Sequence, residues 1–420
     1  MTRKIVSGDN STNIISDGDV NLNFQLDSKN LTGELRNIIR EEICKLAQAG
    51  NSLELEASIS VVNGDVINAE KSIDLLARNT TESYSKNMLK VANLYVLVNQ
   101  DKAISSYRSA YESSSDDFDI INSYALYLMN LGRLKEAEAI YLKAIKDLVL
   151  NSELEPIEGN LGLLYKNLGD YDKAIEHLII ASELSIKLDK DIGSSKHLNN
   201  LGACYHNQGD YEEAINVLTV ALDTVVSLEV NGQLENKDLK STESSILANI
   251  SISYKAAYQI TQNSIFLTKA IDYALQGVEV CDKNQLDNQL GRLYGNLANF
   301  YDLLDNRDKH REYLTKTKDT FNEQTSDKDK LTCLMNFGLL CFKEGNTAKA
   351  IEYYLDCLNQ GVSGKYKKLH ALTQYNLAIA LHSIGEVEQA KNAAEIACSL
   401  FKELGQYSVV KDLKLAFAIN

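Results

Sequence analysis

Proline and tryptophan are almost absent from this 420-residue chain, which contains one proline and no tryptophan. Proline interrupts helices because its ring clashes with the preceding turn and it has no N–H to donate. A chain with so few breaks and with abundant helix-forming residues is expected to be largely helical. The hydrophobic fraction of 44% and the charged fraction of 24% are ordinary for a protein that buries a core.

Basic charge is scarce as well. Lysine and arginine number 43 against 58 aspartate and glutamate residues, which gives a formal net charge of −15 at pH 7. Binding a phosphate backbone requires a basic face. Nucleic acid is therefore not expected as the main partner, although a local basic strip inside a groove is compatible with this count.

Long apolar runs are missing too. The start, "MTRKIVSGDNSTN", has no apolar stretch of signal-peptide length, and no segment approaches the length of a membrane span. We therefore expect a cytoplasmic protein with no membrane partner. The cysteines are odd in number, and five of them lie within apolar helical patterns, which favours reduced thiols over a disulfide framework: Cys204, Cys333, Cys341, Cys357 and Cys398.

No catalytic motif is found in the sequence. The Gly-Lys of "GVSGKYKK" lacks the spacing of a phosphate-binding loop. The cysteines form no Cys-x-x-Cys pair. No His-x-x-x-His pair occurs among the six histidines, which are His177, His197, His206, His310, His370 and His382. We expect no enzymatic activity, no cofactor and no bound metal.

An internal repeat takes the place of such motifs. "GNLGLLYKNLGDYDKA" from Gly159 to Ala174 recurs as "NNLGACYHNQGDYEEA" from Asn199 to Ala214, which is a period of 40 residues. The pattern predicts two antiparallel helices joined by a tight Gly-Asp turn, since glycine accepts the left-handed conformation that ends a helix. The small residues allow the two helices to approach closely.

The helix-pair pattern continues in both directions, with about nine units between residues 51 and 405. One unit near residue 305 lacks the turn glycine and the later alanine, and has Asp305 and His310 in their places. We expect that unit to pack less tightly than its neighbours. The polar stretch 228–243 is expected to be a long loop.

The two ends of the chain differ from the repeats. Residues 1–30 are rich in Asn, Asp and Gly, and their alternating apolar residues predict a short β-like segment. Residues 31–50 are predicted to form an amphipathic helix, and residues 406–420 a helix that caps the array. A strand as short as that of the first segment is unstable alone, so we expect it to pair with another chain or to pack on the first helix.

The repeat resembles the tetratricopeptide repeat, in which Leu-Gly, Tyr and a later Ala have the same spacing. The resemblance implies an all-α fold, a right-handed superhelical solenoid of helix pairs. The long period is similar to that of kinesin light chain and Pins-type arrays. Such arrays are generally protein-binding scaffolds.

One polar position recurs where packing does not explain it. The residue before the Leu-Gly pair, or its equivalent, is asparagine in six consecutive units: Asn160, Asn200, Asn249, Asn296, Asn336 and Asn376. Each amide has a donor and an acceptor, so a row of them can bind the backbone of an extended peptide without reading its side chains. Similar ladders line the concave groove of the related arrays. We call this set the asparagine ladder and expect its members to face water in the absence of ligand.

Four further residues are candidates for the same groove. Asn167 and Asn207 lie two turns beyond a ladder asparagine, and Lys196 and Arg292 lie one turn before one. The basic set of the heat-shock-type carboxylate clamp is missing from the first three units, where Leu89 and Ser123 occupy the ladder position.

Two functions remain open at this point. The first is a non-catalytic scaffold or regulator that holds a peptide on the asparagine ladder. The alternative is a self-assembling structural or sensor subunit of a bacterial defence or signalling complex, a homo-oligomer that forms through residues 1–30. The second rests on the similarity of "SGDNSTNIISDGDVNL" to short Gly-Asp-Asn segments at the start of some such proteins. A third reading, an enzyme on a repeat frame, is disfavoured by the missing catalytic motif. For the ladder asparagines themselves the alternative is that they bond neighbouring helices, which would make them structural.

Overall fold

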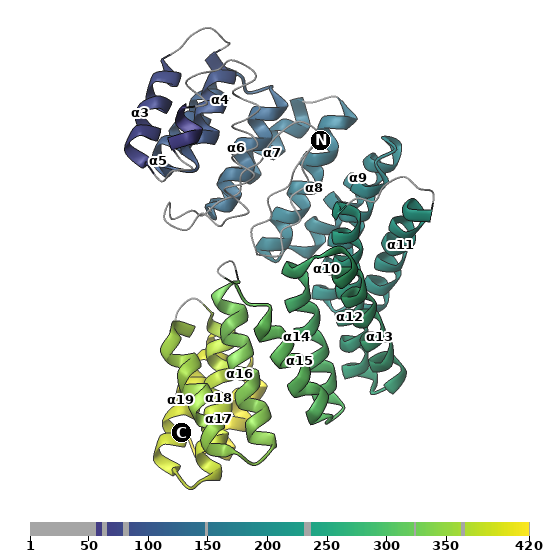
Figure 1. Ribbon diagram of the computed structural model, residues 1–420, viewed down its shortest axis with the longest axis vertical. Coiled ribbons are helices and arrows are strands. Elements are labelled where there is room, and N and C mark those ends of the chain that lie inside the picture. Colours follow the sequence, from purple (N-terminus) through teal and green to yellow (C-terminus); the bar gives the residue numbers. More distant parts are fainter. Residues whose placement is uncertain are drawn as a thin grey trace. The chain divides into compact units, whose positions relative to one another are not determined.

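The computed structural model describes residues 56–60, 65–78, 84–147, 150–230, 237–322, 325–362 and 366–419, and within these ranges the chain is helical with no strand (Figure 1). The β-like segment 1–30 and the helix 31–50 lie outside these ranges. The chain divides into two compact units, unit 1 up to Gln233 and unit 2 from Leu234.

Unit 1 contains nine of the helices that the structure describes beyond residue 65. Their bounds are α3 (Val66–Ala77), α4 (Tyr84–Tyr95), α5 (Gln100–Ser113), α6 (Phe118–Asn130), α7 (Leu134–Asp147), α8 (Asn151–Leu168), α9 (Tyr171–Lys187), α10 (Asp191–Gln208) and α11 (Tyr211–Val230).

Unit 2 continues in the same manner. Its helices are α12 (Lys237–Thr261), α13 (Ser264–Asn284), α14 (Asp287–Leu303), α15 (Arg307–Asp319), α16 (Asp327–Lys343), α17 (Thr347–Cys357), the short π-helical η1 (Leu358–Val362), α18 (Lys367–Ser383), α19 (Val387–Glu403) and α20 (Tyr407–Ala416).

Consecutive helices pack as pairs, and the most extensive packing joins α12 to α13, α8 to α9 and α10 to α11. The turns form as predicted. Gly169, which ends α8, has a φ of +79°, and the next residue, Asp170, accepts a hydrogen bond from the backbone N–H of Lys173 at the start of α9. Helix end and helix start are therefore encoded by two adjacent residues.

Close approach within a pair depends on the glycine of the Leu-Gly pair. A Cβ atom on Gly162 would lie 2.5 Å from Cγ of Leu178, so the second helix inserts a leucine where the first has no side chain. Gly202 and Leu218 repeat the arrangement in the next pair. The core of unit 1 is completed by tyrosines such as Tyr141, which is fully buried.

The first helices of successive pairs also pack on one another. In unit 1, α4 contacts α6, α6 contacts α8, and α8 contacts α10; in unit 2, α12 contacts α14 and α16 contacts α18. We call these sets the first-helix layer of each unit. The ladder asparagines all lie on helices of these layers.

The loop predicted for residues 228–243 is wrong in part. Helix α11 continues to Val230 and α12 begins at Lys237, so 237–243 are helical. The reason is that this polar stretch still has a helical face: Leu239, Thr242 and Glu243 are buried, and Lys240 pairs with Glu243 at 2.9 Å.

Among the residues that the structure describes, no helix combines the length and the apolar character needed to cross a bilayer.

Candidate functional site

Buried polar side chains gather on α8 and α10, the last two members of the first-helix layer of unit 1. Glu155, Glu158 and Asn160 on α8 are all less than a tenth exposed. The same holds for six residues of α10, which are Ser194, Ser195, Lys196, His197, Asn199 and Asn200. Buried polar groups are costly unless they are bonded, so their partners indicate what this region does.

Asn160 is joined to the preceding first helix. Its Nδ2 donates to Oδ1 of Asn122 on α6 at 2.8 Å, and the hydroxyl of Tyr141 donates to the same oxygen at 3.4 Å. Oδ1 of Asn160 is itself buried and accepts no hydrogen bond in the structure. The Asn160 amide is therefore held in one orientation, and its Oδ1 has no hydrogen-bond donor.

Asn200 is also bonded to the preceding first helix, but it accepts the hydrogen bond where Asn160 donates one. Nζ of Lys166 on α8 donates to Oδ1 of Asn200 at 3.0 Å. An ammonium group only donates, so this contact fixes which end of the Asn200 amide faces Lys166. Burial lowers the pKa of Lys166.

An ionic network lies beside the two asparagines. Glu155 accepts a hydrogen bond from His197 Nε2 at 2.6 Å and from Lys190 Nζ at 3.1 Å. Burial opposes ionisation of Glu155, and the hydrogen bonds and charges of His197 and Lys190 outweigh it, so the pKa of this carboxyl is held below its usual value. The network joins α8, which bears Asn160, to α10, which bears Asn200.

A second histidine joins α8 to α9. His177 on α9 lies 2.6 Å from Glu158 through its Nδ1, and its ring stacks on Tyr165 with the centroids 5.3 Å apart. Tyr165 in turn donates to Glu138 at 2.7 Å. These contacts explain the repeated tyrosine as a residue that packs and bonds between helices.

The ladder residues of unit 2 have a different environment. Asn249, Asn296, Asn336 and Asn376 are partly exposed, whereas Asn160 and Asn200 are 0% and 3% exposed. Nδ2 of Asn336 approaches Oδ1 of Asn299 on α14 at 3.5 Å, a weak contact. The expectation that ladder amides face water is thus wrong for Asn160 and Asn200, because groups of the neighbouring first helices enclose them.

The other predicted groove residues differ in their exposure. Asn167 and Asn207 are exposed, Lys196 is 8% exposed, and Arg292 is exposed and donates to the carbonyl oxygen of Ser245 at 3.3 Å. The structure brings Lys196 and the two ladder residues Asn160 and Asn200 into one buried region. Asn167 and Asn207 lie at the ends of α8 and α10, outside it.

Sequence reasoning missed Lys166. A signal for it was present, because the residue six positions after the ladder asparagine is basic in three consecutive units, as Lys166, His206 and Lys255. That position faces the following first helix, which the bond from Lys166 to Asn200 demonstrates.

The described cysteines and acidic residues offer little chemistry. Six cysteines are free and buried, and burial raises the pKa of Cys204 to about 11 and that of Cys333 to about 12, which leaves them as neutral thiols at pH 7. Within the ranges described above, no group of three His, Cys, Asp or Glu side chains is placed to hold a metal ion.

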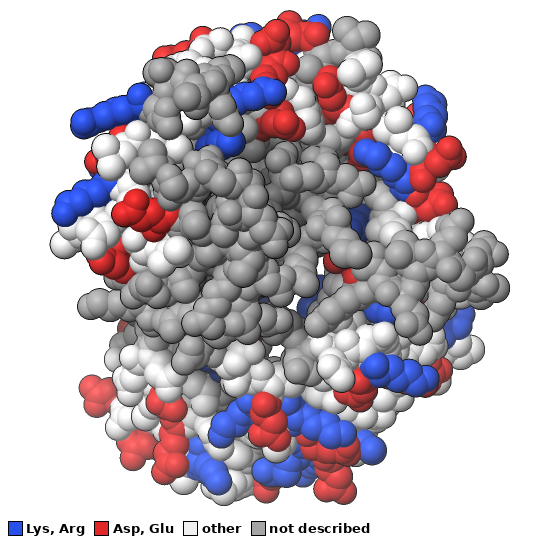
Figure 2. Space-filling view, turned by 45° about the horizontal axis from the view of Figure 1, so that its top comes forward, with Lys and Arg blue, Asp and Glu red and all other residues white. Residues whose placement is uncertain are grey.

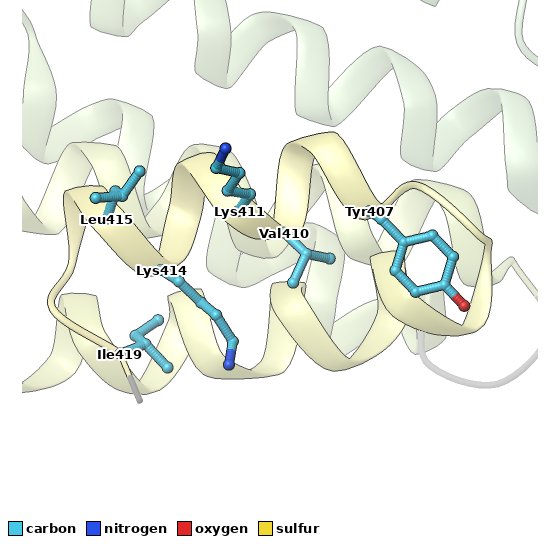
Figure 3. Close-up of a pocket in the computed structure, with 6 residues that line it drawn as sticks. All are labelled: Tyr407, Val410, Lys411, Lys414, Leu415 and Ile419. Atoms are coloured by element: carbon cyan, nitrogen blue, oxygen red, sulfur yellow. The ribbon is translucent and has the colours of Figure 1, made fainter.

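The surface provides a second candidate region at the end of unit 2. Figure 3 shows the outer side of α20, where a shallow pocket is lined by Tyr407, Val410, Lys411, Lys414, Leu415 and Ile419. Helix α20 packs inward through Leu413, which is 1% exposed, while Leu415 on its outer side is 74% exposed. Helix α20 packs against α19, and its outer side presents apolar residues together with Lys411 and Lys414.

Charge on the surface is mixed. On the face drawn in Figure 2, acidic and basic side chains alternate over the described residues without an extended patch of one sign. This distribution agrees with the low basic content of the chain and provides no broad basic strip on that face.

Comparison with known proteins identifies the repeat. Sequence profiles of the tetratricopeptide repeat match residues 118–146, 153–225 and 331–359, and these ranges coincide with helix pairs of both units. The chain therefore contains tetratricopeptide repeats. The all-α array of paired helices is what such repeats build, so the resemblance stated from the sequence is confirmed. No curated protein matches the chain.

Solved structures with a similar arrangement are distant in sequence. The apo form of RapI is 13% identical with a TM-score of 0.57, and the match covers 88% of this chain and 99% of that one. The signal transduction ATPase PH0952 from Pyrococcus horikoshii, which has a tetratricopeptide repeat sensor, is 15% identical with a TM-score of 0.56, covering 85% and 57%. Human IFIT1, solved as a dimer with PPP-AAAA, is 14% identical with a TM-score of 0.51, covering 92% and 87%. At these identities the likeness shows the fold alone.

Proposed function

We propose that the protein is a non-catalytic scaffold or regulator that binds an extended peptide segment on the first-helix layer of unit 1, through Asn160 and Asn200. Tetratricopeptide repeat proteins are generally protein-binding scaffolds, and a protein or peptide ligand fits the absence of a catalytic motif in the sequence.

The proposal rests on the Oδ1 atom of Asn160. This oxygen is buried, accepts no hydrogen bond, and belongs to an amide whose Nδ2 is already bound to Asn122. A buried acceptor without a donor costs about 1–3 kcal/mol. A backbone N–H of a bound peptide would supply the missing donor, and any residue except proline has one.

Rigidity of the site supports the same function. Asn160 is held by Asn122, Asn200 is held by Lys166, and Glu155 with His197 joins the two helices that bear them. Both amides are already oriented, which reduces the ordering entropy lost on binding. Because they are 0% and 3% exposed, side chains of the neighbouring first helices must move aside before a ligand can reach them. Because backbone groups are recognised, we expect tolerance of many side-chain sequences.

The test is a selection from a display library of unstructured 12-residue peptides on the intact chain, followed by titration of enriched peptides by fluorescence anisotropy. Asn160→Ala should weaken binding roughly two- to tenfold, the value of one hydrogen bond. Asn167→Ala, an exposed asparagine on the same helix, is the matched control and should leave affinity unchanged.

Melting curves of both variants accompany the titrations, so that a folding defect is distinguished from lost contacts. Failure to enrich any peptide, or equal affinity of enriched peptides for the wild type and Asn160→Ala, contradicts the proposal.

A further inference from the structure

Two consecutive second helices of unit 1, α9 and α11, expose apolar side chains to solvent. On α9, Ile180 is 42% exposed and Ile186 is 60% exposed, and on α11, Val220 is 55% exposed and Val226 is 41% exposed. The two residues of α11 stand 40 residues after those of α9, which is one period of the repeat. Matched positions of neighbouring repeats lie on the same surface of a stacked array. The four side chains therefore form one apolar surface that is open to solvent.

An acidic side chain stands at the centre of each apolar pair. Glu183 lies three residues from each of the two isoleucines, and Asp223 lies three residues from each of the two valines. Both carboxylates are exposed, and neither forms an ion pair with a described residue. A partner for this surface needs aliphatic groups on both sides of a positive charge. We call the surface the α9–α11 face, which consists of Ile180, Glu183, Ile186, Val220, Asp223 and Val226.

Helix α13 of unit 2 shows a different choice of residues at the same positions. When Ala270 of α13 is aligned with Ala214 of α11, the corresponding residues are Gln276, Glu279 and Asp282. All three are polar and exposed, and Glu279 pairs with Lys283 at 2.7 Å. Exposed aliphatic residues on both sides of an unpaired carboxylate are therefore not a requirement of the repeat.

Helix α3 of unit 1 has the complementary pattern. Ile67 is 69% exposed, Leu75 is 52% exposed, and the exposed Lys71 stands four residues from each. Residues four apart lie on one face of a helix, and Lys71 forms no ion pair with a described residue. The apolar residues are about 12 Å apart along α3 and about 9 Å apart along α9 or α11. The two surfaces thus match in length as well as in charge.

The complementary surfaces do not meet within unit 1. Helix α3 packs on α4, whereas α9 packs on α8 and α10, and α11 packs on α10. Figure 1 shows α3 well separated from both α9 and α11 within this unit. A second copy of the chain can bring them together, because a contact between two different surfaces of identical molecules is heterologous and joins copies head to tail.

We propose that the protein self-associates by placing α3 of one copy against the α9–α11 face of a second copy. In this arrangement Lys71 lies between Glu183 and Asp223, and the aliphatic side chains of α3 contact those on either side. Opposite charges across such a contact fix its register and suppress wrong partners. The apolar part is small, so the contact is weak and forms at high protein concentration. The inference goes beyond peptide binding, since neither surface includes a ladder asparagine.

Sedimentation velocity on the intact chain tests this contact between about 10 and 500 µM, the range in which a weak interface is populated. The mean mass of the wild type should rise with concentration. Lys71→Glu should weaken association by about tenfold or more, because like charges across an interface repel strongly. The double variant Glu183→Lys, Asp223→Lys should do the same. All three residues are exposed, so both variants should fold, which melting curves followed by circular dichroism verify.

A mixture of the two variants tests whether the two surfaces bind each other. The Lys71→Glu chain keeps an intact α9–α11 face, and the double variant keeps an intact α3. An equimolar mixture should therefore recover the association that neither variant shows alone. Lys411→Glu is the matched control, because Lys411 of α20 also has an exposed apolar residue four positions to either side, Tyr407 and Leu415. It should associate like the wild type.

Each other outcome overturns the proposal. These outcomes are a wild type that stays monomeric over the whole range, association that persists in Lys71→Glu, and a mixture of folded variants that stays monomeric. Loss of association in Lys411→Glu in place of Lys71→Glu would show that α20 binds the second copy, and this result also overturns the assignment to α3. Peptide binding through Asn160 is measured separately and does not depend on any of these results.

Discussion

The asparagine ladder has the same residue in both units and two different environments. In unit 1, Asn160 and Asn200 are buried, and each is bound to a side chain of the preceding first helix at 3.0 Å or less. In unit 2 the ladder asparagines are partly exposed, and Asn336 makes a contact of 3.5 Å. A repeated residue therefore fixes a position on the helix but not its surroundings.

The neighbouring residues account for the difference. Asn160 depends on Asn122, which is 38 residues earlier, and Asn200 depends on Lys166, which is 34 residues earlier. In unit 2 the counterpart of Lys166 after Asn296 is Asp302, which instead binds Lys343 at 2.7 Å and His310 at 3.1 Å. The polar partners of the ladder changed from one unit to the other while the asparagine stayed.

The largest expected effect comes from removing Glu155, the carboxylate that joins α8 to α10. Glu155→Ala should destabilise unit 1 by about 2–5 kcal/mol, because it leaves His197 buried without a partner for its Nε2. Hydrogen exchange of the amides in α8 to α11 measures this loss.

The control for Glu155→Ala is Glu183→Ala, an exposed residue of α9. Protection in α12 to α19 serves as an internal reference. Unchanged protection of α8 and α10 in Glu155→Ala would mean that the ionic network does not stabilise unit 1.

The second prediction tests the comparison directly. Asn160→Ala should destabilise the protein by about 1–3 kcal/mol, since it removes the shorter of the two hydrogen bonds to the buried Oδ1 of Asn122 and leaves only the 3.4 Å contact from Tyr141. Asn296→Ala, at the same repeat position but partly exposed, should change stability by less than about 0.5 kcal/mol. Thermal melting of the two variants compares them, and equal losses would show that the two environments do not differ energetically.

The fold follows from the sequence to a large extent because its determinants are local. Gly169 and Asp170 set a turn, and Gly162 admits Leu178 from a helix that follows at once. The predicted loop 228–243 was wrong in part because composition was weighed above the helical spacing of Leu239 and Glu243.

The candidate site was less accessible to sequence reasoning. The ladder positions are visible as a repeat, but the burial of Asn160 depends on Asn122 and Tyr141, which no local pattern connects to it. Lys166 was overlooked because a single lysine at a helix end is usually solvated. Only its bond to Asn200 and the lack of a carboxylate partner in the described chain distinguish it. Peptide binding by the ladder stays a prediction.

A third, smaller effect concerns pH. The pKa of Glu155 is lowered in the folded state, so its ion pairs contribute stability above the unfolded value of about 4.3, and this contribution is lost as the pH falls through the folded pKa. Lys190 is 42% exposed in its side chain, so solvent screens its pair with Glu155 to less than about 1 kcal/mol.

The free energy of unfolding of Lys190→Met should therefore lie below that of the wild type at pH 7, and the two should converge as the pH falls through the folded pKa of Glu155, which lies below its unfolded value. Urea denaturation at pH 7, 5 and 3 gives the difference. A gap that persists at pH 3 would assign the effect to lost packing of the lysine stem and not to the ion pair.

The smallest effect is expected at the turn between α14 and α15, where unit 2 departs from the glycine used in unit 1. Asp305 adopts a φ of +51°, the left-handed conformation that Gly169 adopts after α8. An L-residue in this conformation costs about 1–2 kcal/mol, and aspartate tolerates it better than most. Replacement by glycine removes that strain, but it adds about 0.5–1 kcal/mol of chain entropy to be lost on folding, and it removes an exposed pair with Arg307 worth about 0–1 kcal/mol. These terms nearly cancel, so Asp305→Gly should change the stability of unit 2 by about 0.5 kcal/mol or less.

The contacts around this turn argue against the loose packing expected from the sequence. His310 is 2% exposed and bound to Asp302, and Tyr301 stacks on Tyr313. Hydrogen exchange across α14 and α15 in the wild type and in Asp305→Gly measures both points: similar protection in the two proteins is expected, and a large gain in protection for the glycine variant would show that the aspartate turn is a strained, easily opened joint.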